Sequence, residues 1–124
     1  MNEQITKITL KDANEYYDAA QEELCRPEED LVPYKICRSA YKSVGNYLAA
    51  YLFNHGFEVK DEMTLEFLLE KSISFNPKFG VLDLKPLFYG NAHHEEVIHA
   101  TSETMQVYLG IAEQTRDLVI ELLD

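Results

Sequence analysis

The sequence predicts an all-α protein, a single domain over residues 1–124 folded as an antiparallel up-down four-helix bundle. Apolar residues recur at helical spacing in four segments. Proline, glycine and asparagine mark the ends of these segments, and the connections between them are short. The chain has 124 residues, 46% of them hydrophobic, which is enough for one continuous core. Four such helices can bury their apolar stripes only against one another.

The first helix is expected over about residues 9–25. Thr9, with Asp12 three residues later, forms a start similar to a capping box. The dipeptide Arg26-Pro27 ends the helix, because the residue before a proline is pushed out of the helical region. An acidic connection follows at residues 28–30. The apolar stripe of this helix consists of Ala13, Tyr16, Tyr17, Ala20 and Leu24.

The second helix is expected over about residues 33–54 and should be central. Pro33 suits a first helical turn. Its φ angle is fixed near the helical value, and an N–H at that position would have no partner within the helix. Gly56 is well placed for a left-handed C-cap. The inward stripe consists of Cys37, Ala40, Tyr41, Val44, Tyr47, Leu48 and Tyr51.

A third helix follows Thr64, whose hydroxyl suits an N-cap, and it should end at Asn76-Pro77. Residues 77–90 contain proline and glycine but remain apolar, so we expect an irregular packed turn or a short helix there. The last helix is expected over about residues 102–123. Its apolar face carries Met105, Tyr108, Ile111, Ala112, Thr115, Leu118, Val119 and Leu122.

The charge of the chain narrows the class of protein. Eleven basic and 22 acidic residues give a net charge of -11, which disfavours non-specific binding to nucleic acid. No apolar run approaches the roughly 20 residues needed to span a bilayer. Cys25 and Cys37 fall on different predicted helices without metal-type spacing, as expected of reduced thiols. We therefore expect a soluble, cytoplasmic protein without a membrane partner.

Three segments resemble HEPN domains, a family of helical domains. Residues 34–56, YKICRSAYKSVGNYLAAYLFNHG, resemble the long central helix of that family. Residues 63–69, MTLEFLL, look like its short third helix, and residues 101–122 are similar to its final helix. The resemblance covers about 90 residues and rests on helical pattern and order. It implies a HEPN-like bundle that acts as a homodimer or with a separate protein partner.

Many HEPN proteins are metal-independent ribonucleases with an arginine, four to six intervening residues and a histidine near the final helix. Arginine can stabilise phosphate charge there, and histidine can transfer protons. This chain departs from the motif, because Arg26, Arg38 and Arg116 have no histidine at that distance. A ribonuclease with an altered motif is therefore disfavoured. Non-catalytic relatives bind nucleotides or proteins, or partner nucleotidyltransferases. The resemblance thus implies a non-catalytic binding module with no cofactor.

One group of cations suggests where an anionic ligand such as a nucleotide would bind. Lys35, Arg38 and Lys42 are spaced i, i+3 and i+7, which places them on one face of the second helix. Nearby hydrogen-bonding groups for a phosphate or carboxylate are expected from Ser39, Ser43 and Asn46. The alternative is a solvated helix face, or one that pairs with acidic residues of an adjacent helix.

A second group contains ligands that transition metals prefer. His94, Glu95, Glu96 and His99 lie within about two helical turns, and Glu96 with His99 forms a Glu-x-x-His unit. Such a unit can contribute to a di-metal site, but the chain has no second copy. The alternatives are a metal-binding helical-bundle enzyme and a surface cluster without a metal.

Overall fold

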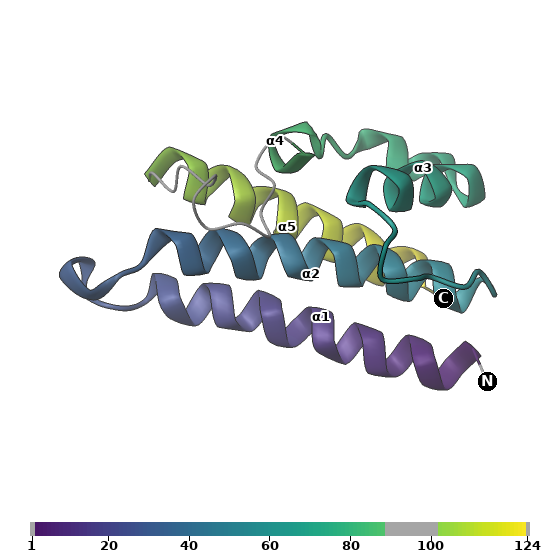
Figure 1. Ribbon diagram of the computed structural model, residues 1–124, viewed down its shortest axis with the longest axis horizontal. Coiled ribbons are helices and arrows are strands. Elements are labelled where there is room, and N and C mark those ends of the chain that lie inside the picture. Colours follow the sequence, from purple (N-terminus) through teal and green to yellow (C-terminus); the bar gives the residue numbers. More distant parts are fainter. Residues whose placement is uncertain (1, 89–101, 124) are drawn as a thin grey trace.

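The computed structural model describes residues 2–88 and 102–123, and every regular element in these ranges is helical. The prediction of an all-α protein is confirmed. None of the helices in these ranges combines the length and apolar character that crossing a bilayer requires. The elements are α1 (Asn2–Leu24), η1 (Glu28–Asp30), α2 (Pro33–Asn54), α3 (Leu65–Phe75), η2 (Pro77–Val81), α4 (Lys85–Phe88) and α5 (Ser102–Leu122), where η marks a 3₁₀ helix (Figure 1).

Helix α2 is the central element and packs against α1, α3 and α5 (Figure 1). It runs antiparallel to α1. The Val32 N–H, just before α2, donates a hydrogen bond to Glu23 near the end of α1, whereas Lys42, further along α2, lies over the ring of Tyr16, further from that end. Helix α5 runs in the same direction as α2. The amide of Asn54 at the end of α2 donates to the Leu123 carbonyl just past α5, at 3.4 Å. Half of α2 is buried: Ile36, Cys37, Ala40, Ser43, Val44, Tyr47, Leu48, Ala49, Ala50, Tyr51 and Leu52.

Helix α3 does not follow the predicted up-down order, in which it would run antiparallel to α2. The chain leaves α2 and turns back along it before α3 begins, so α3 runs in the same general direction as α2 (Figure 1). Its last residue, Phe75, lies 5.3 Å from His55 at the end of α2, measured between ring centroids. Its N-terminal end shares a surface hollow with Tyr41, in the middle of α2. The reversal lies in the connection, residues 55–64, which carries the chain back along α2 before α3 begins (Figure 1).

Local signals in the sequence fix most helix ends. Pro33 opens α2, and Gly56 follows its end with a φ of 81°, as the C-cap prediction requires. The Thr64 hydroxyl caps α3 by accepting from the Phe67 N–H at 3.1 Å. The predicted start at Thr9 is wrong, because α1 already begins at Asn2. Thr6 and Thr9 are both buried within α1, so packing extends this helix beyond the local start signal.

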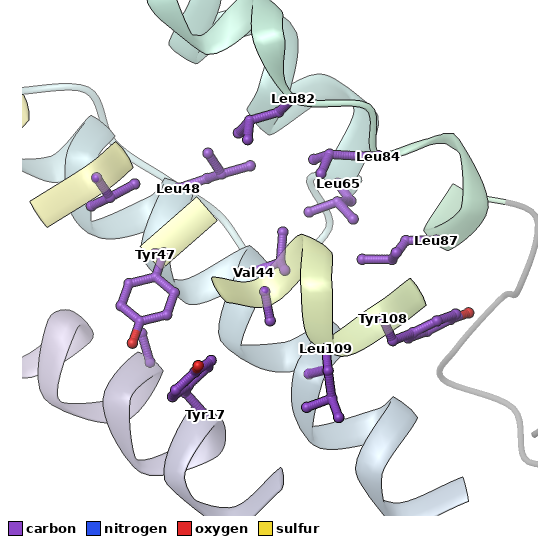
Figure 2. Close-up of a cluster of buried hydrophobic side chains, with 14 of the residues drawn as sticks. Tyr17, Val44, Tyr47, Leu48, Leu65, Leu82, Leu84, Leu87, Tyr108 and Leu109 are labelled. Atoms are coloured by element: carbon purple, nitrogen blue, oxygen red, sulfur yellow. The ribbon is translucent and has the colours of Figure 1, made fainter. Parts of the chain in front are cut away.

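The core is continuous and contains buried tyrosines, as Figure 2 shows for Tyr17, Tyr47 and Tyr108. Tyr47 is fully buried, and its hydroxyl donates a hydrogen bond to the Asn14 side-chain oxygen. This bond supplies the partner that a buried hydroxyl needs. Burial raises the pKa of Tyr47, and it raises the pKa of the Cys37 thiol to about 11. Both groups are therefore protonated in the folded protein at neutral pH.

The cap of α3 yields a first prediction. Replacing Thr64 by alanine removes the acceptor of the Phe67 N–H, so the free energy of unfolding should fall by about 1 kcal/mol. Thr64→Ser keeps a hydroxyl oxygen and should retain most of the stability. Urea denaturation of both variants measures the difference. Equal stability of Thr64→Ala and the unchanged protein would contradict the importance of this cap.

Buried thiol and phenol groups yield a prediction for alkaline pH. The unfolded chain releases these protons near the ordinary pKa values of 9.0 for Cys37 and 10.0 for Tyr47, whereas the folded chain retains them. Above pH 9.0 the unfolded state therefore binds fewer protons, and the free energy of unfolding should fall as the pH rises. Urea denaturation across this range measures the fall. In Cys37→Ala the decline that starts near pH 9.0 should be shallower, and an identical profile would contradict this assignment.

Candidate functional site

A hollow of about 570 Å³ opens where the end of α1 meets the start of α2. The antiparallel pairing of α1 and α2 creates it, because the last turns of one helix face the first turns of the other. Its walls combine two cations, one carboxylate, two hydroxyl groups and a small apolar surface. The lining residues are Ala19, Glu23, Val32, Tyr34, Lys35, Arg38 and Ser39.

The two cations of the hollow are Lys35 and Arg38, both exposed. Arg38 differs from the other two arginines of the chain. Arg26 lies 3.4 Å from a Glu23 oxygen, and Arg116 lies 2.9 Å from an Asp117 oxygen. Within residues 2–88 and 102–123, Arg38 makes no such ion pair. Its guanidinium therefore has donors available for an anion in the hollow.

Lys42, the third cation predicted for this site, lies outside the hollow. Its ammonium nitrogen is 5.5 Å from the centre of the Tyr16 ring, a distance suited to a cation–π contact. The structure thus brings Lys35 and Arg38 to one hollow and places Lys42 beside it. The helical spacing alone did not reveal this division, because it says nothing about the aromatic ring on α1.

The neutral groups expected to assist the cations are also divided. Ser39 lines the hollow. Ser43 is fully buried, and its hydroxyl donates to the Ala40 carbonyl at 2.7 Å. The Asn46 amide donates to the Lys42 carbonyl at 2.8 Å. The expectation that Ser43 offers a hydrogen-bonding group to an anion is therefore wrong, and Tyr34 supplies the second hydroxyl of the hollow instead.

Glu23 is a charged residue of the hollow that the sequence did not predict. One carboxylate oxygen accepts from the Val32 N–H at 2.9 Å, and the other accepts from Arg26 at 3.4 Å. The Val32 bond is the main cause that lowers the pKa of Glu23, and the charges of Arg26 and Lys35 lower it further. Only 11% of the side chain is exposed. The Val32 N–H and Arg26 thus occupy both carboxylate oxygens, and among the described residues Glu23 makes no ion pair with Arg38. The sequence feature that could have indicated this role is an acidic residue in the last turn of a helix, just before a short connection to the next helix.

Metal-type ligands are not clustered in the part of the chain that the structure describes. There, no group of three or more His, Cys, Asp or Glu side chains is arranged to hold a metal ion. The predicted ligands His94, Glu95, Glu96 and His99 lie outside the described residues, so the metal hypothesis stays a prediction. His55 is described and packs against Tyr51 with the rings tilted, at 4.4 Å between the ring centroids.

A second hollow, of about 470 Å³, lies between the middle of α2 and the start of α3. It differs from the first in charge, because three carboxylates line it and no lysine or arginine does. Such a lining disfavours an anion. Its residues are Tyr41, Asp61, Glu62, Met63, Thr64, Leu65, Glu66 and Phe88.

Comparison with family models, with curated proteins and with solved structures gives no match to this chain. A function must therefore be inferred from the residues themselves. The first hollow holds donors of both charged and neutral type, together with one engaged carboxylate. This combination is suited to binding, since the guanidinium and ammonium groups donate hydrogen bonds and do not accept them.

Glu23 yields a prediction for acid pH. Its lowered pKa means that the folded state favours the carboxylate, so this stabilisation is present above pH 4.5 and is lost as the pH falls through the folded pKa. Glu23→Gln should therefore lower the melting temperature at neutral pH. The difference from the unchanged protein should shrink in acid. Melting curves recorded from neutral pH to below 4.5 measure it.

Glu22 provides the matched control for that experiment. It neighbours Glu23 but is exposed, and its side chain makes no hydrogen bond or ion pair with any residue that the structure describes. Glu22→Gln makes the same change of charge and should leave the melting temperature nearly unchanged. If both variants lose the same stability at neutral pH, net charge rather than the Val32 contact is responsible.

Proposed function

We propose that this chain is a binding module that recognises a small anionic ligand, with a nucleotide as the first candidate, and that it is not an enzyme. The observation that carries the proposal is Arg38, which lines a hollow together with Lys35 and has no ion pair within the described residues. The other two arginines hold carboxylates. A guanidinium left unpaired at a concave surface is the arrangement that phosphate or carboxylate recognition requires.

The size and charge of the hollow support the same proposal. Its volume of about 570 Å³ falls within the range of roughly 300–1,000 Å³ typical of small-molecule sites. The chain as a whole carries a net charge of -11, so two cations at one hollow form a local exception to a field that repels anions. The hydroxyls of Tyr34 and Ser39 add neutral donors beside them.

The proposal extends to the arrangement and partners that the HEPN resemblance implies. We propose a HEPN-like bundle that acts as a homodimer or with a protein partner such as a nucleotidyltransferase, in the cytoplasm. What supports this part is the order of the helices, with a long central α2, a short α3 and a long final α5. The antiparallel α1–α2 pair and the parallel α2–α5 pair are compatible with it.

The proposed ligand site can be tested by thermal denaturation of the untagged protein with nucleoside mono-, di- and triphosphates and with inorganic phosphate. A ligand that binds only the folded state stabilises it by about 2.7 kcal/mol at about one hundred times its Kd, so the melting temperature should rise with concentration. Arg38→Glu should remove this rise, because it replaces the anion donor by a repelling carboxylate. Circular dichroism checks that the variant keeps its helical content.

Lys42→Glu is the matched control, since it makes the same change of charge on the same helix but outside the hollow. It should leave most of the ligand-induced rise in place. Two results would contradict the proposal: no concentration-dependent rise with any of these anions, or an equal rise in Arg38→Glu and the unchanged protein. Holding ionic strength constant separates binding from general salt effects.

The metal alternative is tested with the same thermal assay, and the ribonuclease alternative is tested with an RNA-cleavage assay. A metal-using bundle enzyme predicts a rise with one divalent transition metal that is lost in His99→Ala. A ribonuclease with an altered motif predicts RNA cleavage that is lost when Arg116 or His94 is replaced. In the structure Arg116 stacks on Tyr17, 4.4 Å from the ring centre, and bonds Asp117. These contacts give Arg116 a structural role, which makes the ribonuclease the weaker alternative.

A further inference from the structure

The hollow at the start of α2 adjoins a third hollow, of about 370 Å³, on the side of α1. The third hollow is lined by Asp12, Glu15, Tyr16 and Ala19. Ala19 lines the first hollow as well. It is exposed and carries only a methyl group, so no large side chain separates the two spaces at this residue. A ligand held in the first hollow can therefore extend along α1 into the third.

The lining residues of the third hollow share one side of α1 because of their spacing. Asp12, Tyr16 and Ala19 are at i, i+4 and i+7, and Glu15 is four residues before Ala19. Glu23, which lines the first hollow, follows four residues after Ala19. Four residues of helix rise by roughly 6 Å. The carboxylates of the third hollow thus begin about one helical turn from the point where it meets the first.

The two hollows differ in the sign of their charge. Two cations line the first, whereas the third has the carboxylates of Asp12 and Glu15 and no lysine or arginine among its lining residues in the described part of the chain. Neither carboxylate makes an ion pair with a described residue. Lys42 lies over the Tyr16 ring but lines neither hollow. One end of the combined space therefore favours an anion, and the other favours hydrogen-bond donors.

We infer that the ligand of this site is a nucleoside monophosphate rather than a di- or triphosphate, an inference that rests on the proposed function. The single phosphate binds Arg38 and Lys35, and the ribose hydroxyls donate to Glu15 and Asp12. A phosphate monoester carries a charge of about -1.5 to -2 at neutral pH, which two cations can balance. Carboxylates also accept from ribose hydroxyls in dinucleotide-binding folds.

Charge disfavours a longer phosphate chain. Each further phosphate adds negative charge that the two cations do not balance, and an extension along α1 brings it against Glu15. In the other direction Glu23 lines the hollow, and η1 in the following connection carries Glu28, Glu29 and Asp30. Inorganic phosphate fits the cations but leaves the carboxylates of the third hollow without donors. A nucleoside monophosphate matches both hollows.

The test is isothermal titration calorimetry of the full chain at constant ionic strength, without divalent metal. The probes are inorganic phosphate, the mono- and triphosphates of the common ribonucleosides, and the dideoxy monophosphates that lack the ribose hydroxyls. One ribonucleoside monophosphate should bind about tenfold or more tightly than its dideoxy analogue and than inorganic phosphate, as expected when hydrogen bonds to a charged acceptor are lost. Its triphosphate should bind more weakly.

A charge reversal tests the third hollow directly. Asp12→Lys with Glu15→Lys should weaken binding of the monophosphate and strengthen binding of the triphosphate, so that the preference inverts. Glu70→Lys with Glu113→Lys makes the same change of net charge at exposed residues of α3 and α5 that line neither hollow. This control should keep the preference for the monophosphate. Circular dichroism checks the helical content of both variants.

Three results would overturn the inference and leave the anion site in place. They are a triphosphate that binds at least as tightly as its monophosphate and loses binding in Arg38→Glu, equal binding of ribose and dideoxy monophosphates, and an equal change of preference in the two charge-reversal variants. Absence of Arg38-dependent binding by any of these anions would overturn the proposed function together with the inference.

Discussion

The close packing of α1 against α2 is the interaction on which the rest of the structure depends. Small side chains make it possible, since α1 turns Ala13 and Ala20 toward the core and α2 contributes Ala40 and Ser43. A small side chain lets two helix backbones approach closely. The same pairing creates the hollow, brings Tyr16 under Lys42 and supplies Asn14 as the partner of a buried tyrosine. The candidate site is therefore a product of the helix pair rather than of either helix alone.

Sequence patterns predicted those features of the fold that depend on neighbouring residues. Pro33, Gly56 and Thr64 each act within one turn of their own position, and each helix end they predict is present. The start of α1 was missed because it depends on packing across the helix pair, where Thr6 and Thr9 are buried. The direction of α3 was missed for a related reason, since the path of residues 55–64 has no local signature.

The candidate site also combines features that depend on neighbouring residues, which were predicted, with features that depend on packing between helices, which were not. Helical spacing grouped Lys35 with Arg38, and both line one hollow because they lie one turn apart on one helix. It included Lys42 and omitted Glu23, since both decisions depend on which residues of α1 face α2. Glu23 reaches Val32 across nine residues of chain, a distance at which periodicity carries no information.

The order of contacts along the chain also bears on how this protein folds. Helices α1 and α2 are neighbours in sequence, joined by residues 25–32, so their pairing closes a short loop. Helix α5 reaches α2 only after the intervening residues 55–101, and it must close a much longer loop. The hairpin of α1 and α2 can thus form the folding nucleus, with α5 docking later on a surface that already exists. Changes within the hairpin then act mainly on the folding rate, whereas changes in the α5 contact act mainly on the unfolding rate.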